Sequence, residues 1–573
     1  MSAKNIISKR ALPNSRLFTR WGRAVDRENP LPEYPRPGFV RESFLNLNGV
    51  WEYAIYKNGA EFGGWQGEIV VPFSPESALS GVEKRVFPDD VLYYRRSFEV
   101  KKGFLRDKTV LHFGAVDDFC AVYLNGKAAG EHQGGFVPFD IDVTGLIKEG
   151  RNEIYLEVTD PTDTGFISRG KQSGKPGGIW YSAQSGIWQT VWLESLPAAH
   201  IESVRMTPDV DGGFLRIFPV VRANSENADG NSLKSTGNIN KNSLNVGKNT
   251  EKADGNSRNS NENSSDTAQN TRKVKAVITD NGRVAAEADL IPNAENTVKL
   301  TDFTLWSPEN PHLYDIEFTF CGDRVKSYFG MRKFSIGKDK DGIVRLTLNN
   351  KPYFHNGLLD QGYWPDGLLT APSDDAMLSD IKKMKELGFN MLRKHIKIEP
   401  LRWYYHCDRE GMIVWQDMIN GGGEQKFSII ALLPFLGKKM KDTAENYEKF
   451  GRGNAESRES YYNELDKMIS LLYNTVSIGV WVPFNEGWGQ FDALRAVDFI
   501  RERDDGRVVD HASGWYDQGG GDLNSVHIYF KAIRTPKDGK RAAVLSEFGG
   551  YSHHVKGHVW NENRVFGYRI FKE

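Results

Sequence analysis

Two glutamates in the C-terminal third of the sequence offer the clearest chemistry. Glu486 follows the apolar run 478–484, and Glu547 follows the run 542–546. Both runs predict buried strands, so each carboxylate would lie where a strand ends and a loop begins, which is where a parallel barrel holds its catalytic groups. Two carboxylates in such positions can flank a glycosidic bond. One would protonate the leaving oxygen while the other attacks the anomeric carbon.

Composition narrows the classes of partner. The chain has 573 residues, and one domain per 100–200 residues predicts about three to five domains. Lys and Arg number 74 against 75 Asp and Glu, without a long basic run, so neither nucleic acid nor an anionic membrane is expected as a partner. Its 14 Trp and 22 Tyr residues could stack on the apolar faces of sugar rings, although most such rings pack in cores.

The cysteines and the N-terminal residues indicate the cellular compartment in which the protein is expected. Cys120, Cys321 and Cys407 are far apart and have no C-x-x-C spacing, which predicts unpaired thiols in a reducing compartment. Residues 1–10 lack the apolar segment of a signal peptide, and no stretch has the length of a membrane span. We therefore expect a cytoplasmic protein.

The first third and the middle of the chain are expected to be all-β. Short alternating segments with turns such as Asn125-Gly126 predict a jelly-roll sandwich over 1–198. A second β-rich stretch, 199–334, has the size of an immunoglobulin-like sandwich once the segment 223–272 is set aside. That segment consists mainly of Asn, Ser, Lys, Asp and Gly and predicts a disordered loop inserted between two strands.

From residue 335 to 573 strands alternate with helices. Residues 374–387 carry apolar side chains at helical spacing and are closed by Gly388. Seven strand candidates in a β/α rhythm predict a TIM barrel: 352–359, 389–393, 412–415, 478–484, 507–510, 525–529 and 542–546.

Ordered motifs at the ends of these strands resemble glycoside hydrolase family 2, the β-galactosidase, β-glucuronidase and β-mannosidase group. The motifs are Asn356-Gly357 with Asp360-Gln361, Arg393-Lys394-His395, Trp415-Gln416-Asp417, Asn485-Glu486 and Ser546-Glu547. The resemblance covers essentially the whole chain, and it implies the same order of a jelly-roll sugar-binding domain, an immunoglobulin-like domain and a (β/α)8 barrel.

The resemblance also implies roles for individual residues. Glu486 would be the acid/base, Glu547 the nucleophile, and Asn485 a donor to the sugar hydroxyl next to the anomeric carbon. Tyr529 would hydrogen-bond the nucleophile. The remaining residues expected to bind substrate are His395, Asp360, Trp415, Asp417, His527 and Trp488.

Two departures from the family pattern are visible. The stretch 418–423 supplies neither the acidic residue nor the histidine that binds magnesium in some family members, so we expect no metal and no cofactor. His553, His554 and His558 lie close in sequence but lack an acidic partner at ligand spacing. The sequence also predicts a barrel that ends before its eighth strand, and hence a C-terminally truncated chain.

Two functions of different classes remain open from the sequence. The first is a retaining exo-β-glycosidase that forms a covalent glycosyl-enzyme. The second is a non-catalytic carbohydrate-binding protein, or an inactive fragment of such an enzyme. The motifs do not decide between a galactoside, a glucuronide and a mannoside, and the oligomeric state is not predicted.

Overall fold

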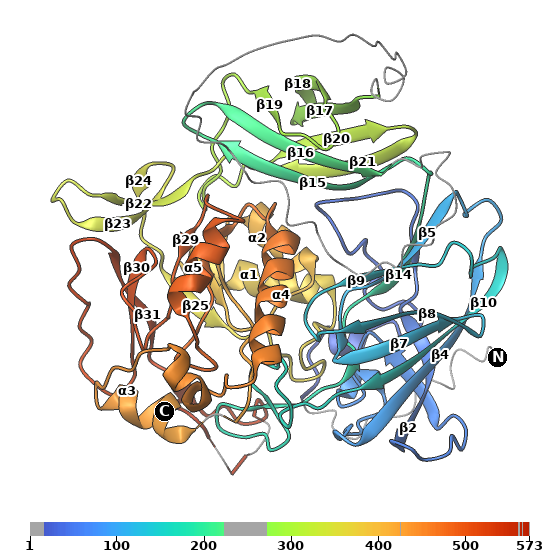
Figure 1. The fold of residues 1–573 in the computed structure, drawn as a ribbon, viewed down its shortest axis with the longest axis horizontal. Coiled ribbons are helices and arrows are strands. Elements are labelled where there is room, and N and C mark those ends of the chain that lie inside the picture. Colours follow the sequence, from blue (N-terminus) through green and yellow to red (C-terminus); the bar gives the residue numbers. More distant parts are fainter. Residues whose placement is uncertain (1–16, 223–271, 425, 560–561, 564, 572–573) are drawn as a thin grey trace, which may run out of the picture.

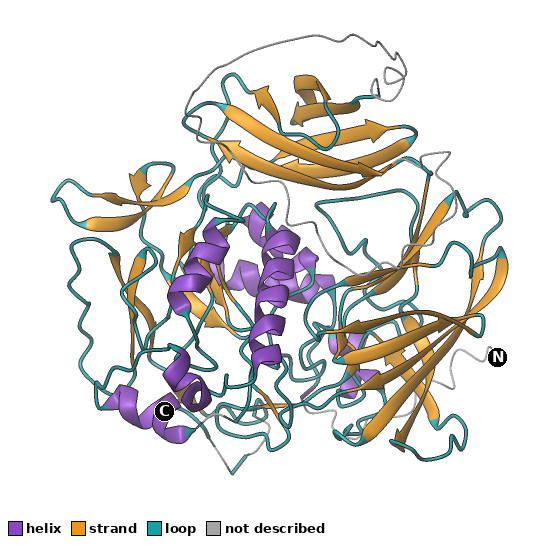
Figure 2. Cartoon of the chain, viewed as in Figure 1, coloured by secondary structure: helices purple, strands orange, loops and turns teal. Residues whose placement is uncertain are grey.

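The computed structural model describes residues 17–222, 272–424, 426–559, 562–563 and 565–571. The N-terminal β-rich domain lies beside a region of parallel strands and helices, and a second β-sandwich lies across one end of that region (Figure 1). The α-helices gather around the parallel strands, whereas the two flanking domains consist mainly of strands and loops (Figure 2). This is the predicted combination of two sandwiches and a TIM-barrel domain.

The first domain is built on two antiparallel sheets. The larger has the order β3-β2-β4-β10-β7-β8, with β2 at Gly49–Lys57, β3 at Gly67–Val71, β4 at Asp90–Val100, β7 at Phe119–Leu124, β8 at Lys127–Gln133 and β10 at Gly150–Thr159. The smaller has the order β1-β14-β5-β9, with β1 at Leu45–Asn46, β5 at Lys108–Phe113, β9 at Phe139–Asp142 and β14 at Val191–Leu196. Side chains alternate between buried and exposed along β10, as expected for a sandwich with one face on the core.

Short strands lie in the loops of this domain that face the barrel. They are β6 at Val116–Asp117, β11 at Gln172–Ser173, β12 at Tyr181–Ser182 and β13 at Gly186–Ile187. β11 pairs with β12 and β13 pairs with β6, so two short ladders hold parts of the segment 160–187 in place.

The second domain is also a two-sheet sandwich. One sheet has the order β15-β16-β19, with β15 at His200–Asp209, β16 at Phe214–Arg222 and β19 at Asn296–Lys299. The other has the order β18-β17-β20-β21, with β17 at Val274–Asp280, β18 at Arg283–Leu290, β20 at Tyr314–Phe320 and β21 at Asp323–Phe329. The predicted disordered insert 223–272 lies outside the described residues apart from Arg272.

The barrel domain begins with a small antiparallel sheet, β22 at Phe334–Lys338, β23 at Val344–Leu348 and β24 at Lys351–Pro352. Five parallel strands follow: β25 at Gly357–Asp360, β26 at Met391–Lys394, β27 at Ile413–Asp417, β28 at Ile478–Val482 and β29 at Val508–Val509. A second parallel pair consists of β30 at Leu523–Ile528 and β31 at Ala542–Phe548. The predicted first strand 352–359 is wrong as one element, because β24 pairs antiparallel with β23 and β25 starts a new parallel ladder.

Helices cover the parallel strands, and α1 lies where the apolar spacing of 374–387 predicts a helix. They are α1 at Asp374–Glu386, α2 at Leu401–Glu410, α4 at Ala455–Leu472 and α5 at Ala493–Arg501. The Ser373 side chain accepts a hydrogen bond from the Ala376 amide and so caps α1. Gly411, at φ +71°, ends α2.

Residues after β27 and β31 form smaller elements. The first group comprises one turn of π-helix at Ser428–Leu432, α3 at Leu433–Phe435 and a 3₁₀ segment at Ala444–Phe450. The second is the pair β32 at Tyr551–His553 and β33 at Arg569–Phe571. The absence of an eighth barrel strand stays a prediction.

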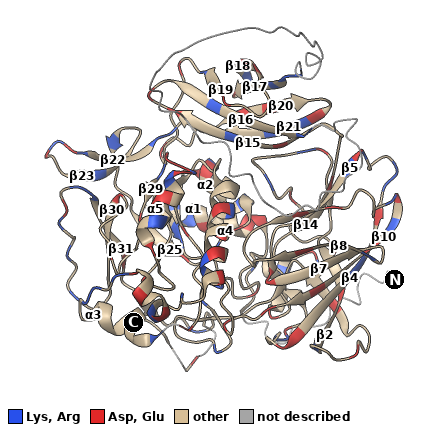
Figure 3. Ribbon diagram, in the orientation of Figure 1, with Lys and Arg blue, Asp and Glu red and all other residues tan. Residues whose placement is uncertain are grey.

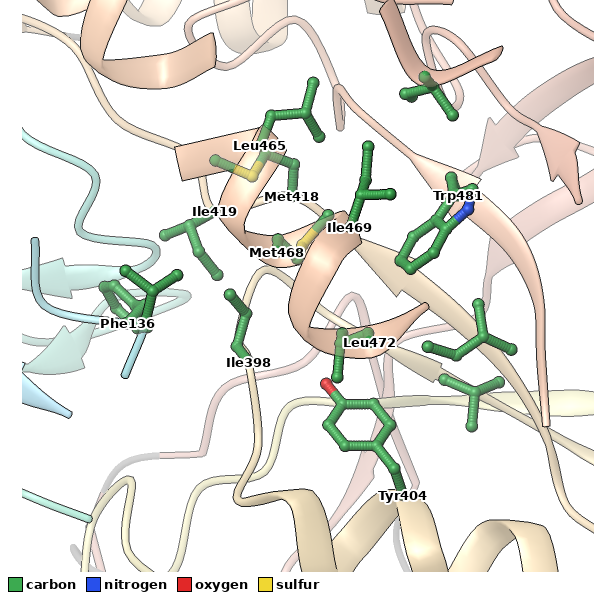
Figure 4. Packing of buried hydrophobic residues seen from close by; sticks show 14 of the residues in the cluster. Phe136, Ile398, Tyr404, Met418, Ile419, Leu465, Met468, Ile469, Leu472 and Trp481 are labelled. Atoms are coloured by element: carbon green, nitrogen blue, oxygen red, sulfur yellow. The ribbon is translucent and has the colours of Figure 1, made fainter. Parts of the chain in front are cut away.

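One hydrophobic cluster joins the first domain to the barrel. Figure 4 shows Leu465, Met468 and Ile469 of α4 in one cluster with Phe136 of the first domain, with Ile398 and Ile419 between them. Buried apolar area is the main source of stability, and here it is shared between domains. The first domain is therefore held against the barrel by the core itself.

Surface charge agrees with the balanced composition. Lys and Arg alternate with Asp and Glu over all three domains (Figure 3). No described helix has the length and apolarity needed to cross a membrane. All three cysteines are unpaired, as predicted.

Trp306 connects the second domain to the base of the barrel. Its side chain is 0% exposed, packs in the cluster that contains Phe334 and Trp415, and donates a hydrogen bond of 2.8 Å to the Asp408 carbonyl. We predict that Trp306→Ala lowers the free energy of unfolding by about 3–5 kcal/mol, because it removes a large buried ring and leaves a cavity. Phe354→Ala is the control, since Phe354 is 82% exposed. Equal denaturation midpoints for the two variants would contradict the prediction.

Candidate active site

The two predicted catalytic glutamates meet at the carboxyl ends of the parallel strands. One carboxylate oxygen of Glu486, one of Glu547 and a ring nitrogen of His527 all lie within 4.8 Å of one another. The Tyr529 hydroxyl lies 2.6 Å from Glu486 Oε1 and 2.7 Å from Glu547 Oε2. A single phenol thus bridges the two carboxyl groups.

The local backbone conformation orients the side chains of both glutamates. Glu486 has φ +52° and Gly487 has φ +72°, so the chain turns sharply where the strand β28 gives way to its loop. A Cβ at Gly487 would lie 2.6 Å from the Tyr516 ring, which leaves room for glycine alone. On the other side, the register between β30 and β31 shifts so that Glu547 lies opposite His527. Such bulges re-aim side chains next to active sites.

The Arg393 side chain contacts several residues of the candidate site. Its guanidinium donates to Asp417 Oδ1 at 2.9 Å and to Asn485 Oδ1 at 2.8 Å, and it forms an ion pair of 3.1 Å with Glu547 Oε1. Burial alone would raise the pKa of the Glu547 carboxyl. The charges of His527 and Arg393 outweigh burial and hold that pKa well below its usual range.

His527 and Tyr529 form a second layer of contacts. His527 Nδ1 lies 2.8 Å from Glu486 Oε1, and its Nε2 lies 3.3 Å from Arg393 Nη1. Burial, followed by the two carboxylates, raises the pKa of Tyr529 well above its usual range. The phenol therefore keeps its proton and acts as a donor.

Of the other predicted residues, Asp417 and Asp360 form ion pairs at strand ends, whereas Trp415 lies in the core. Asp417 accepts from Arg393 and from His395 Nδ1, the latter at 3.0 Å, and therefore orients both side chains. Asp360 forms an ion pair of 3.0 Å with Lys394 at the end of β25. Trp415 lies in the hydrophobic cluster with Phe334 and donates to His355 at 2.9 Å, so its ring is part of the barrel core, and its contact with a sugar stays a prediction.

Several buried polar atoms around the glutamates have no hydrogen-bond partner within the described part of the chain. They include Asn485 Nδ2, His395 Nε2, Trp488 Nε1 and Asn420 Nδ2, and Glu547 Oε1 has its Arg393 ion pair but no hydrogen bond. Buried polar groups are normally satisfied, so exceptions in one place call for an explanation. Together they form a set of groups suited to the hydroxyls of a sugar. Burial, followed by the Lys171 charge, lowers the pKa of His395, which leaves its ring neutral near pH 7.

Sequence reasoning missed two residues of this site. Arg393 was part of a recognised motif, but nothing in the motif says that its guanidinium reaches Glu547 and Asn485. Lys171 comes from the first domain, more than 300 residues before either glutamate, and belongs to no motif. A charged residue in the middle of a buried strand was the one signal available, and it applies to Arg393 alone.

The carboxylate and imidazole atoms of Glu486, His527 and Glu547 are also close enough to hold a metal ion. The phenol bridge and the Arg393 ion pair satisfy these carboxylates instead, and a cation would compete with Arg393 for Glu547. The expectation of a metal-independent site stays a prediction.

Comparison with known proteins identifies the family of the chain. Three family models match the chain: the sugar binding domain of glycosyl hydrolases family 2 over residues 83–197, the central domain of that family over 199–332, and its TIM barrel domain over 343–536. The chain belongs to glycoside hydrolase family 2.

Individual relatives are distant. A putative β-glucuronidase of Formosa agariphila is 25% identical over 500 residues, covering 79% of this chain and 50% of that protein. A β-galactosidase of Leuconostoc mesenteroides is 24% identical, covering 86% of this chain and 41% of that protein. The chain thus spans half or less of the length of these relatives. The solved structure of a β-glucuronidase from an uncultured Clostridium has a TM-score of 0.63 at 18% identity, over 87% of this chain and 78% of that one.

We predict that Tyr529→Phe lowers kcat/KM about 10- to 100-fold, the size expected for one lost hydrogen bond to a charged group. The acidic limb of the pH profile of kcat/KM should also move to higher pH. Loss of a hydroxyl donor disfavours the ionised form of Glu547 and so raises its pKa. Tyr551→Phe, at an exposed tyrosine, is the matched control. An unchanged acidic limb would show that the phenol does not act on Glu547.

Proposed function

We propose that this chain is a retaining exo-β-glycosidase that removes terminal β-linked sugars by double displacement. The observation that carries the proposal is the pair of carboxyl groups joined by one phenol, with oxygens within 4.8 Å. Retaining enzymes hold their carboxyl groups about 5–5.5 Å apart, whereas inverting enzymes leave roughly 6.5–9.5 Å for a water molecule. The short separation supports the retaining mechanism.

The number of protons available to the Tyr529 hydrogen bonds supports the assignment of Glu486 as the acid and Glu547 as the nucleophile. The Tyr529 hydroxyl carries one proton and can donate to one carboxyl oxygen, so its second short contact needs a proton from the other carboxyl group. Glu547 is paired with Arg393 and has a depressed pKa, which keeps it ionised. The proton then belongs to Glu486, as an acid catalyst requires.

The steps follow from these positions. Glu547 attacks the anomeric carbon while the bond to the leaving oxygen breaks and Glu486 protonates that oxygen. The aglycone departs as an alcohol, and the sugar is left esterified to Glu547. Glu486, now a carboxylate, then takes a proton from water as the water attacks the same carbon. The free sugar leaves with its configuration retained, and both carboxyl groups return to their starting states.

Substrate binding is assigned to the unpartnered polar atoms. Asn485 Nδ2 lies beside Glu486 in sequence and is free to donate to the hydroxyl next to the anomeric carbon. His395 Nε2 and Trp488 Nε1 would contact other hydroxyls of the same ring. The first domain closes one side of this site, because Trp180 stacks on Trp488 with ring centroids 5.1 Å apart. A site that is closed on one side favours cleavage of a terminal sugar over cleavage within a chain.

We predict that Glu547→Gly abolishes hydrolysis of every aryl β-glycoside, whatever the leaving group, because the nucleophile is lost. Added azide should restore turnover and give a glycosyl azide of inverted configuration, since azide attacks the substrate directly. The measurement is turnover of 4-nitrophenyl glycosides with product analysis by NMR. Azide products of retained configuration would contradict the assignment of Glu547.

For Glu486→Ala we predict a loss of about 10²- to 10⁴-fold on substrates with poor leaving groups, the usual contribution of an acid catalyst. Substrates with activated leaving groups should be spared, and azide should give a retained product. Glu502→Ala, at an exposed position after α5, is the control. If wild-type protein binds sugars without turning over any substrate, the chain is a carbohydrate-binding protein and the enzymatic proposal fails.

A further inference from the structure

Lys171 of the first domain lies at the candidate active site without a hydrogen-bond or ion-pair partner. It is 8% exposed, and its ammonium forms no hydrogen bond or ion pair with any residue in the described ranges. The nitrogen lies 5.5 Å from the centroid of the Trp488 ring. Burial lowers the pKa of Lys171, and the charged groups that act on it most are Glu547, Glu486 and Asp417, in that order.

The backbone on both sides of Lys171 is fixed. The Arg169 and Gly170 amides both donate to the Asn420 carbonyl at 2.9 Å, in the loop that follows β27. The Arg169 guanidinium donates to the Gly422 carbonyl at 2.6 Å. On the other side, the Gln172 side chain is anchored in the first domain, because its Nε2 donates to Asp117 Oδ2 at 2.8 Å. Lys171 is thus held at the junction of the two domains.

Gly170 adds a steric reason for this placement. It has φ +62°, and a Cβ there would lie 3.1 Å from the Ile396 carbonyl, so the chain passes the barrel at close range. The next part of the same segment also contacts the site, because the Tyr181 hydroxyl donates to Gln361 and its ring packs on Tyr363 at 4.6 Å. The first domain therefore supplies one wall of the site, with Lys171 set into it.

The chemistry of a buried lysine without a partner points to an anionic ligand. A buried charge is costly unless it is paired, and Arg393 already pairs with Asp417 and Glu547. The ammonium of Lys171 makes no such pair, although it lies among the groups that would surround a sugar ring. Among sugars of one ring type, a uronic acid differs from its neutral counterpart by carrying a carboxylate in place of a hydroxymethyl group.

We propose that Lys171 binds the carboxylate of a terminal β-linked uronic acid, so that a residue of the first domain determines the sugar specificity of the barrel. This inference rests on the proposed glycosidase function. A contact between an ammonium and a carboxylate is a charge-assisted hydrogen bond, which is about twice as strong as a neutral one. A neutral sugar offers Lys171 a hydroxyl acceptor alone.

The test compares two substrates that differ only at that group, 4-nitrophenyl β-galacturonide and 4-nitrophenyl β-galactoside, and repeats the comparison with the glucuronide and glucoside. We expect wild-type protein to prefer the uronides. In Lys171→Met the ratio of kcat/KM for uronide over neutral sugar should fall about 100-fold, as for one lost charge-assisted hydrogen bond. Lys171→Arg should keep part of the preference. Lys175→Met, an exposed lysine of the same segment, is the control and should leave the ratio unchanged.

The outcomes separate this inference from the proposed function. Equal losses on both substrates of a pair would overturn it, because Lys171 would then act on Glu547 or on the fold and not on the carboxylate. Wild-type protein that hydrolyses neutral glycosides but no uronide would also overturn it while leaving the glycosidase proposal intact. If no substrate is hydrolysed, calorimetry with free galacturonate and galactose decides: weaker binding of galacturonate alone to Lys171→Met supports the inference. Identical binding, or no binding, contradicts it.

Discussion

The candidate site depends on one buried guanidinium. Arg393 on β26 contacts Asp417 on β27, Asn485 after β28 and Glu547 on β31, so that four segments of the barrel meet at one positive charge. A buried charge of this kind must have its donors satisfied, and breaking such a group by removing one member usually costs several kcal/mol. The same ion pair keeps Glu547 ionised. Stability at the end of the barrel and the protonation state of the proposed nucleophile therefore have a common cause.

The first domain packs tightly against the barrel domain that carries Arg393. The main hydrophobic cluster includes Phe136 and Trp188 of the first domain together with α4 and β28 of the barrel. Above that cluster, the segment 168–170 is hydrogen-bonded to the loop after β27. A sandwich that contributes to the core can place side chains in the site with the precision of the barrel itself, as Trp180 on Trp488 shows.

The sequence was informative where chemistry follows from position along a strand. Glu486 and Glu547 could be paired because the carboxyl ends of parallel strands meet at one face of a barrel. The alternation along β27 likewise indicates that Trp415 and Asp417 both face inward, but it carries no information on depth. Trp415 lies in the core cluster, and Asp417 contacts Arg393. The distinction depends on what the neighbouring strands present at the same height, and a single strand does not encode it.

The position of Lys171 at the site could not be predicted from the sequence. Its place depends on contacts between residues that are far apart in the chain, such as Arg169 with Gly422 across 253 positions. No local pattern reports a contact of that length, because propensity and periodicity describe a few neighbours at a time. The insert at 223–272 and the end of the barrel remain predictions for the separate reason that the described contacts do not bear on them.

The hydrogen bonds between segment 168–170 and the loop after β27 also have a kinetic meaning. The first domain has a core of its own besides the cluster that it shares with the barrel, whereas these bonds form between two surfaces that must already be folded. Large proteins fold domain by domain, and docking follows as a slower step. We therefore expect the candidate site to be completed late in refolding, after a compact form in which the two glutamates are in place while the side formed by the first domain is still open.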